Sequence, residues 1–255
     1  MDFIPQFLLD YQPSIVPLLT MLIGLLYFSV PQVALRHIGV LPVSNHPEAF
    51  GEGRSTFSGF LILLGALCFF TKEPILIFVL GLAWGVAAFG KLLQIFADGA
   101  RERSVFIRFA LALFFSAICI ANSGLPTFST NLDIALVNVI ASVSAFLTLC
   151  LGLLCLFAPS FAGSLMRLRS NVVVEGAIGE IRGNVAGFYI ATSLAVLFIG
   201  GTHSIVALGL CWLMTAFGRM VSMLSDKANN VYNWVSLLVE LLLAALPLSI
   251  AFGVL

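Results

Sequence analysis

The chain has 255 residues, of which 60% are hydrophobic and only 9% charged, and its mean hydropathy is +1.10. A soluble domain of this size needs more charge on its surface, and the apolar runs are long enough to cross a bilayer core of about 30 Å. The runs do not alternate apolar and polar residues, which excludes a transmembrane β-barrel, and the zero net charge does not indicate a nucleic-acid partner. The composition therefore predicts an all-α membrane protein.

The predicted elements begin with a short segment, residues 1–13, which carries acids but no base. A cleaved signal peptide would need a positive start, so we expect this segment to lie at the membrane surface. Eight transmembrane helices follow, separated by polar, proline-rich or glycine-rich loops such as PVSNHPEAFGEGR and TKEP. The predicted spans are 14–35, 55–71, 74–97, 104–122, 133–158, 183–200, 204–225 and 232–252.

The basic residues distribute very unevenly over the two sides of this arrangement. Only Lys72 falls on one side. The other side holds Arg36, Arg54, Lys91, Arg101, Arg103, Arg108, Arg167, Arg169, Arg182, Arg219 and Lys227. Because basic loops stay in the cytoplasm, this bias predicts a multi-pass protein of the bacterial inner membrane with both termini periplasmic or extracellular.

The sequence repeats itself at an offset of 128 positions. GLAWGVAAFGK, which ends at Lys91, aligns without a gap with GLCWLMTAFGR, which ends at Arg219. GEGRSTFSGF (51–60) aligns in the same register with GEIRGNVAGF (179–188). We therefore predict two four-helix repeats, residues 14–127 and 128–255. Four spans return the chain to its starting side, so both repeats have the same orientation, and their pseudo-twofold axis runs along the membrane normal.

The repeated pattern is E-x-R-x-x-x-(A/S)-G-F, then AFG(K/R), then Asp seven residues on. It resembles a family of small bacterial four-helix membrane domains of unknown function, similar in general plan to DoxX-like proteins. The resemblance covers nearly all of both halves and implies a fold but no reaction. The halves differ at one position of interest, since Ala112 stands in the first where Glu240 stands in the second.

Charged residues near the ends of the spans are the first candidates for a site. Glu52 with Arg54, and Glu180 with Arg182, begin the second and sixth spans. An acid at a helix start is favoured by about 0.3–1 kcal/mol, so a structural role and an ion pair explain these residues without catalysis. The other candidates are spaced by seven, which places Lys91 with Asp98, and Arg219 with Asp226, on one helix face.

Glu240 is the most informative single residue, because it lies inside the apolar run NWVSLLVELLLAALPL. An intramembrane carboxylate marks either a ligand or proton site or an ion pair between helices. Arg219 lies at a similar depth on the preceding span, so we predict a buried Glu240–Arg219 pair, with Glu180 as a second partner for Arg219. Lys91 in the first half would extend toward the interface or turn to Glu52.

No motif indicates a cofactor. The histidines His37, His46 and His203 do not group as metal ligands, and the five cysteines form no CxxC pair. We expect a non-catalytic membrane protein, either a scaffold or accessory subunit for another membrane protein, or a binder of a lipid or other apolar ligand. Two alternatives stay open: a small-molecule or proton-coupled transporter that uses Glu240 and Arg219, and a membrane enzyme that acts on a lipid or quinone.

Overall fold

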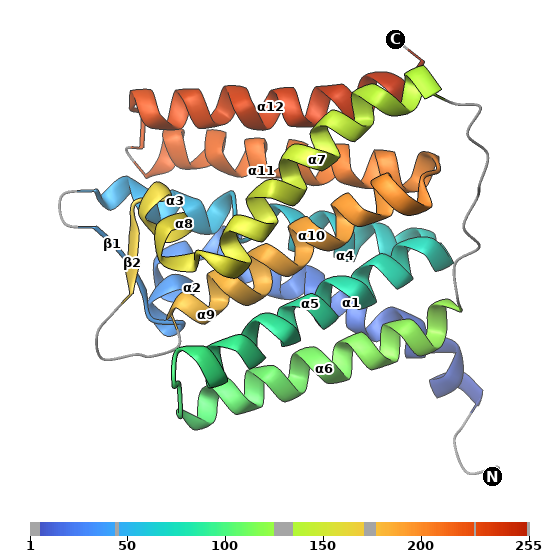
Figure 1. The fold of residues 1–255 in the computed structure, drawn as a ribbon, viewed down its shortest axis with the longest axis horizontal. Helices are drawn as coiled ribbons and strands as arrows, with labels where there is room; N and C mark the ends of the chain where they lie inside the picture. The colour runs from blue at the N-terminus through green and yellow to red at the C-terminus, as the bar shows by residue number, and fades with distance from the viewer. Residues whose placement is uncertain (1–5, 44–45, 125–134, 171–176, 227, 254–255) are drawn as a thin grey trace.

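The computed structural model describes residues 6–43, 46–124, 135–170, 177–226 and 228–253 as a bundle of long, roughly antiparallel helices (Figure 1). Within these residues, seven helices are long and apolar enough to cross a membrane, or eight if a bent pair near the start of the chain is one span. The chain is therefore a multi-pass, all-α membrane protein, as its composition predicts.

The long helices are joined by short helices and loops. The helices are α1 (Gln6–Ser29), α2 (Pro31–His37), α3 (Gly51–Arg54), α4 (Gly59–Thr71), α5 (Pro74–Ala97), α6 (Arg103–Ser123), α7 (Ala135–Phe157), α8 (Pro159–Leu165), α9 (Ala177–Glu180), α10 (Ala186–Leu194), α11 (Thr202–Ser225) and α12 (Val231–Ala251). A 3-10 turn covers Pro47–Phe50, and π-helical segments cover Ile181–Val185 and Ala195–Ile199.

The predicted first span, 14–35, is not one straight helix. α1 stops at Ser29, and the chain bends by 112° into α2. Pro31 causes this break, because its ring disfavours helical geometry at Val30, which adopts φ −129° and ψ 59°. α1 also begins at Gln6, so residues 6–13 are helical and continuous with the rest of α1. Residues 1–5 lie outside the described part.

The second half repeats this break. α7 ends at Phe157, and Ala158 has φ −127° and ψ 55° before Pro159 starts α8. Residues 133 and 134 of the predicted fifth span lie outside the described part.

The second and sixth spans are less regular than predicted, whereas the remaining ones end within two residues of their predicted bounds. Residues 55–58 form a turn instead of helix, because the hydroxyls of Ser55 and Ser58 donate to backbone carbonyls four residues earlier. α4 therefore begins at Gly59, although the apolar segment as a whole runs from Gly51 to Thr71. The sixth span runs over 181–199, and α10 lies between its two π-helical segments.

The central helices pack across the two halves of the chain. α5 packs on α6 and also on α10, whereas α11 packs on α12 and also on α4. Aromatic edges fill the core between them, with Phe60 against Trp212 at 5.3 Å and Trp84 against Phe188 at 5.5 Å between ring centroids. The third long helix of each half thus contacts the second helix of the other half.

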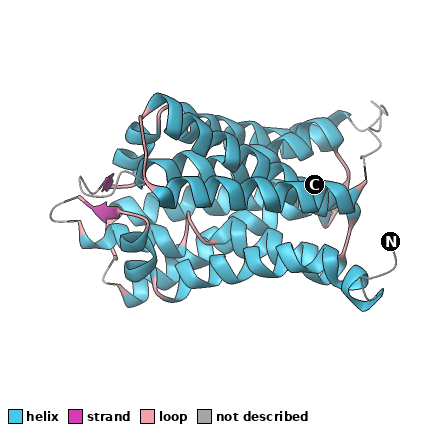
Figure 2. Cartoon of the chain, turned by 90° about the horizontal axis from the view of Figure 1, so that it is seen from below, coloured by secondary structure: helices cyan, strands magenta, loops and turns pink. Residues whose placement is uncertain are grey.

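A small antiparallel ribbon, formed by two segments predicted to be loops, lies at one end of the bundle (Figures 1 and 2). β1 (Val40–Pro42) pairs with β2 (Leu168–Ser170), and Leu41 faces Arg169 at the centre. We call this the ribbon end. α1 begins and α12 ends at the opposite end (Figure 1).

Candidate functional site

Arg219 lies at the centre of a buried charged cluster near the ribbon end, and two carboxylates bind it. Its Nη1 is 2.8 Å from Glu52 Oε1, and its Nε donates to Glu240 Oε1 at 2.8 Å. A third acceptor is Asn233 Oδ1, also 2.8 Å from Nη1. The Arg219, Glu52 and Glu240 side chains are only 5%, 2% and 6% exposed. The predicted Glu240–Arg219 pair is confirmed.

The second partner of Arg219 was predicted wrongly, because it is Glu52 and not Glu180. α11 packs on α3 and α4, which belong to the first half of the chain, so Arg219 meets the acid of that half. Glu52 also accepts a hydrogen bond from Thr56 Oγ1 at 2.6 Å, and the Tyr232 hydroxyl lies 3.3 Å from its Oε1. We call Arg219, Glu52, Glu240 and Asn233 the Arg219 cluster.

A second buried cluster surrounds Glu180. Lys91 Nζ is 2.7 Å from Glu180 Oε1, Arg108 Nη1 is 3.3 Å from the same oxygen, and Asn184 Nδ2 donates to Oε2 at 2.6 Å. Lys91 is 3% exposed, so it neither extends to the interface nor turns to Glu52, contrary to prediction. α5 packs on the segment that carries Glu180 and Asn184, which explains the exchange of partners. We call these four residues the Lys91 cluster.

The remaining candidates form two further pairs closer to the surface. Arg54 Nε is 2.8 Å from Asp226 Oδ2, and Arg182 Nη1 is 2.6 Å from Asp98 Oδ2. Arg54 is also held by the Phe28 carbonyl, which accepts from Nη1 at 2.6 Å. All nine candidate residues therefore take part in ion pairs, and each of these pairs except Arg219–Glu240 joins the two halves of the chain.

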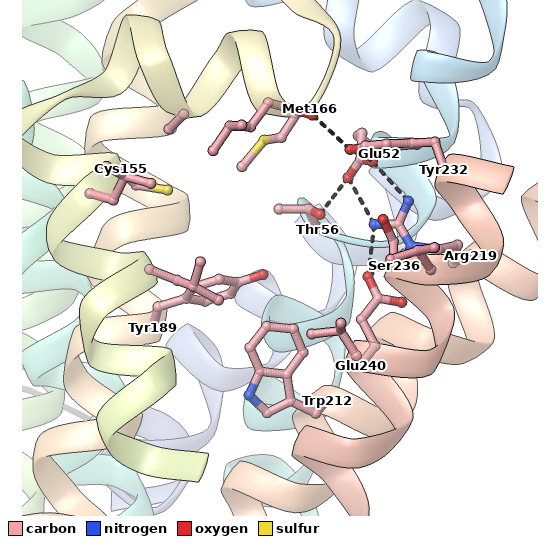
Figure 3. Close-up of a pocket in the computed structure, with 16 residues that line it drawn as sticks. Glu52, Thr56, Cys155, Met166, Tyr189, Trp212, Arg219, Tyr232, Ser236 and Glu240 are labelled. Carbon is pink, nitrogen blue, oxygen red and sulfur yellow. Dashed lines mark hydrogen bonds and ion pairs between the residues drawn. The ribbon is translucent and has the colours of Figure 1, made fainter. Parts of the chain in front are cut away.

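A cavity of about 280 Å³ adjoins the Arg219 cluster (Figure 3). Figure 3 shows Glu52, Thr56, Arg219, Ser236 and Glu240 on one side of it. Its walls are Glu52, Thr56, Leu151, Leu154, Cys155, Ala162, Leu165, Met166, Tyr189, Trp212, Arg219, Tyr232, Val235, Ser236, Val239 and Glu240. Polar groups are thus concentrated at one side, and apolar side chains form most of the remainder.

The cavity reaches the outer surface of the bundle between α7–α8 and α12. Three apolar wall residues are well exposed, namely Leu165 at 50%, Val235 at 54% and Val239 at 47%. The Tyr232 hydroxyl lies 2.9 Å from the Leu165 carbonyl oxygen and so links α12 to the end of α8. A polar, buried floor with an apolar, open rim is an arrangement that suits a ligand with one polar end.

Sequence reasoning missed four residues of this site: Thr56, Tyr232, Asn233 and Ser236. Helical spacing carried a signal for three of them, because Tyr232 and Asn233 lie four and three residues before Ser236, which lies four residues before Glu240, so that all share one face of α12. No comparable signal links Thr56 to α12, since that contact depends on how distant segments pack.

A metal site is not visible in the described part of the chain, where no group of three or more histidine, cysteine or acidic side chains could hold an ion. The five cysteines are free thiols, and Cys150 alone is exposed among them.

No protein-family model matches the chain, and neither a curated protein nor a solved structure matches it. The fold itself defines the class of this protein: it is a multi-pass helical membrane protein with two buried ion-pair clusters.

Proposed function

We propose that this chain is a non-catalytic membrane protein that binds the polar end of a lipid or another amphiphile in the cavity beside Arg219. The observation that carries the proposal is the cavity itself, whose floor holds buried charges and whose rim is apolar and exposed. In a bilayer that rim faces acyl chains, so an apolar tail stays in lipid while the head reaches Tyr232, Ser236 and Glu52. A volume of about 280 Å³ fits a head group rather than a whole lipid.

We infer that the chain is a tandem duplication of a DoxX-like four-helix domain, with repeats 14–127 and 128–255. What supports this is that contacts recur when both partners move by 128 positions, as Arg219–Glu52 becomes Lys91–Glu180. The same shift relates two tryptophan hydrogen bonds to each other, and likewise the two ion pairs closer to the surface. These are Trp84–Thr20 and Trp212–Thr148, and Arg54–Asp226 and Arg182–Asp98.

Each of these ion pairs exchanges partners between the repeats, which is what a twofold axis produces. The ribbon supports an axis along the helices, because its central pair joins Leu41 to its own repeat equivalent Arg169 at one end of the bundle. Such an axis coincides with the membrane normal. The eight-span count then takes α1 with its bend as the first span, equivalent to α7 with α8.

The orientation that we propose puts the ribbon end in the cytoplasm of a bacterial cell and both termini outside. Lys72 follows α4 at the far end, whereas the other bases that the structure describes lie on segments toward the ribbon end, as the positive-inside rule would require. In a background without the native cysteines, we expect a thiol reagent that does not cross membranes to label Thr202→Cys in intact cells. Val43→Cys should react only after lysis. Labelling of Val43→Cys in intact cells would reverse the orientation.

Photolabelling tests the proposed ligand site directly. The probe is a long-chain alcohol with a diazirine near its hydroxyl, added to the protein in mild detergent. We expect the reaction to map to the cavity walls on α7, α8 and α12. Ser236→Phe should block the cavity and reduce this labelling by about tenfold, whereas Leu238→Phe should not, because Leu238 lies two residues away with 59% of its surface exposed. Equal labelling of both variants, or none at the cavity, would refute the proposal.

A further inference from the structure

The two buried clusters carry opposite formal charge. The Arg219 cluster combines one guanidinium with two carboxylates, those of Glu52 and Glu240. The Lys91 cluster combines two cations, Lys91 and Arg108, with one carboxylate. With every group ionised, the first cluster has one negative charge in excess and the second has one positive charge in excess. In a membrane interior each excess charge is costly unless something compensates it.

This difference in charge arises at two places where the halves carry different residues at equivalent positions, 128 residues apart. Glu240 corresponds to Ala112, which removes one acid from the Lys91 cluster. Arg108 corresponds to Ser236, which is a short side chain in the wall of the cavity. In the Lys91 cluster, Arg108 reaches Glu180 from α6 and is 24% exposed, so its excess charge lies near the surface. In the Arg219 cluster, the cavity occupies the place where a cationic side chain would stand.

The Glu240 carboxylate, which accounts for the excess negative charge, also has one oxygen without a hydrogen bond. Glu240 is buried, and its Oε2 has no hydrogen-bond partner among the described residues, although the residue lines the cavity. A buried carboxylate oxygen without a donor loses its hydration free energy without replacement. The neighbouring Asn233, Thr56 and Tyr232 are neutral, so none of them supplies the missing positive charge. A positively charged hydrogen-bond donor from outside the chain would supply both the charge and the missing hydrogen bond.

We propose that the cavity selects amphiphiles whose head is a primary ammonium group on an apolar chain. This inference rests on the proposed function and adds the charge of the ligand to it. An ammonium has three donors and one positive charge, which balances Glu52, Glu240 and Arg219 to neutrality. Its nitrogen takes the place that the Arg108 guanidinium takes in the Lys91 cluster. The tail leaves between Val235 and Leu165, at the exposed rim.

A cation at the edge of the cavity would attract a ligand head of the opposite charge. The guanidinium of Arg167 lies 4.3 Å from the centroid of the Tyr232 ring, and Tyr232 forms part of the cavity wall. A cation there would favour an anionic head, such as a carboxylate. The experiment therefore compares heads of three charges on one and the same chain.

Dodecylamine, dodecanol and dodecanoate are to be compared as competitors of the photoreactive alcohol. At neutral pH we expect dodecylamine to halve the labelling at a concentration about tenfold lower than dodecanol, since hydrogen bonds with a charged partner are stronger than those between neutral groups. Dodecanoate should compete least. If the alcohol competes as well as the amine, or the carboxylate competes better, the ammonium proposal fails while the ligand site stands. If the probe does not label the cavity at all, the proposed function fails first.

Two variants connect the preference to the charges. Glu240→Gln removes the excess negative charge, so the tenfold advantage of dodecylamine should disappear while dodecanol still competes. Glu240→Ala copies Ala112 of the first half and removes the same charge while leaving the cavity open, so it should abolish the advantage as well. The control Asp98→Asn, which removes an acid outside the cavity wall, should keep the advantage. Glu240→Ala keeps the test valid if Glu240→Gln does not fold, and an unchanged preference for the amine in a folded Glu240 variant would overturn the proposal.

Discussion

Replacing Arg219 by glutamine is expected to lower the free energy of unfolding by about 3–5 kcal/mol, the usual cost of removing one partner from a buried ion pair. The guanidinium contacts Glu52 through two nitrogens, at 2.8 and 3.1 Å, and Glu240 through Nε. Without the guanidinium, the carboxylates of Glu52 and Glu240 have no cation between them. Both side chains are less than a tenth exposed, so water cannot replace that cation. Glutamine restores at most part of the hydrogen bonding and none of the charge.

The measurement is unfolding by SDS titration in mixed micelles, followed by tryptophan fluorescence. Lys72→Gln is the control, because Lys72 is exposed at the far end of the bundle and should change stability by less than about 0.5 kcal/mol. If Arg219→Gln and Lys72→Gln were equally mild, the buried cluster would not contribute to the fold.

The variant Glu240→Gln distinguishes the energetic contributions of Glu240 and Glu52, the two carboxylate partners of Arg219. Glu240→Gln leaves the Arg219–Glu52 pair intact and removes one excess charge, so its cost should be smaller than that of Arg219→Gln. In the double variant, part of the loss from Arg219→Gln should be recovered, because one uncompensated carboxylate is gone. Simple additivity of the two losses would mean that the two residues do not interact energetically.

The Arg219–Glu240 pair could be predicted because both residues lie at similar depth on consecutive antiparallel helices. Glu52 could not be chosen over Glu180 in the same way. Both acids begin a span at the same depth, and the sequence does not state which half lies against α11. The choice depends on the packing of α11 on α3 and α4, a contact between segments more than 130 residues apart.

The helices themselves were predicted closely, because an apolar run of about 20 residues has few alternatives in a bilayer. The errors occur where a local backbone effect competes with hydropathy. At Val30 the following proline turns an apolar stretch away from the span, although Ala34 and Leu35 continue the hydrophobic pattern. At Ser55 and Ser58, side-chain hydroxyls bind the backbone and delay the helix.

The cavity depends on two cavity-wall side chains of the second half that are smaller than their equivalents in the first half. Tyr27 is buried in the first half where Cys155 stands in the second, and Arg108 occurs where Ser236 stands. Each substitution leaves the second half with the smaller side chain. The sequence contains this contrast, but only the packing of α7 against α12 brings Cys155 and Ser236 to the same space.

The second large effect is expected from a single methyl group at Gly218. A Cβ at this position would collide with the Arg54 carbonyl oxygen and would lie 2.6 Å from the carbonyl carbon and 3.1 Å from Ser55 Cα. These are backbone atoms, and the ion pair with Asp226 and the bond to the Phe28 carbonyl hold the Arg54 side chain in place. The clash therefore cannot be relieved by rotation of a side chain, and α11 must move away from α3.

Gly218→Ala should consequently destabilise the protein by about 1–3 kcal/mol or more, the range for overpacked cores, despite the better helix propensity of alanine. Gly85→Ala is the matched control, because its Cβ would meet only the Ser116 side chain, with Oγ at 3.0 Å. We expect that control to stay within about 1 kcal/mol of the wild type. SDS titration measures both variants under the same conditions.

The position of Gly218 beside Arg219 gives the experiment a second readout. A shift of α11 that relieves the clash with Arg54 also draws the Arg219 guanidinium away from Glu52, because Glu52 and Arg54 belong to the same short helix α3. We therefore expect Gly218→Ala to reduce photolabelling of the cavity as well as stability, whereas Gly85→Ala should leave labelling unchanged. Equal stability of Gly218→Ala and Gly85→Ala would show that α11 and α3 are not in the close contact on which the Arg219 cluster depends.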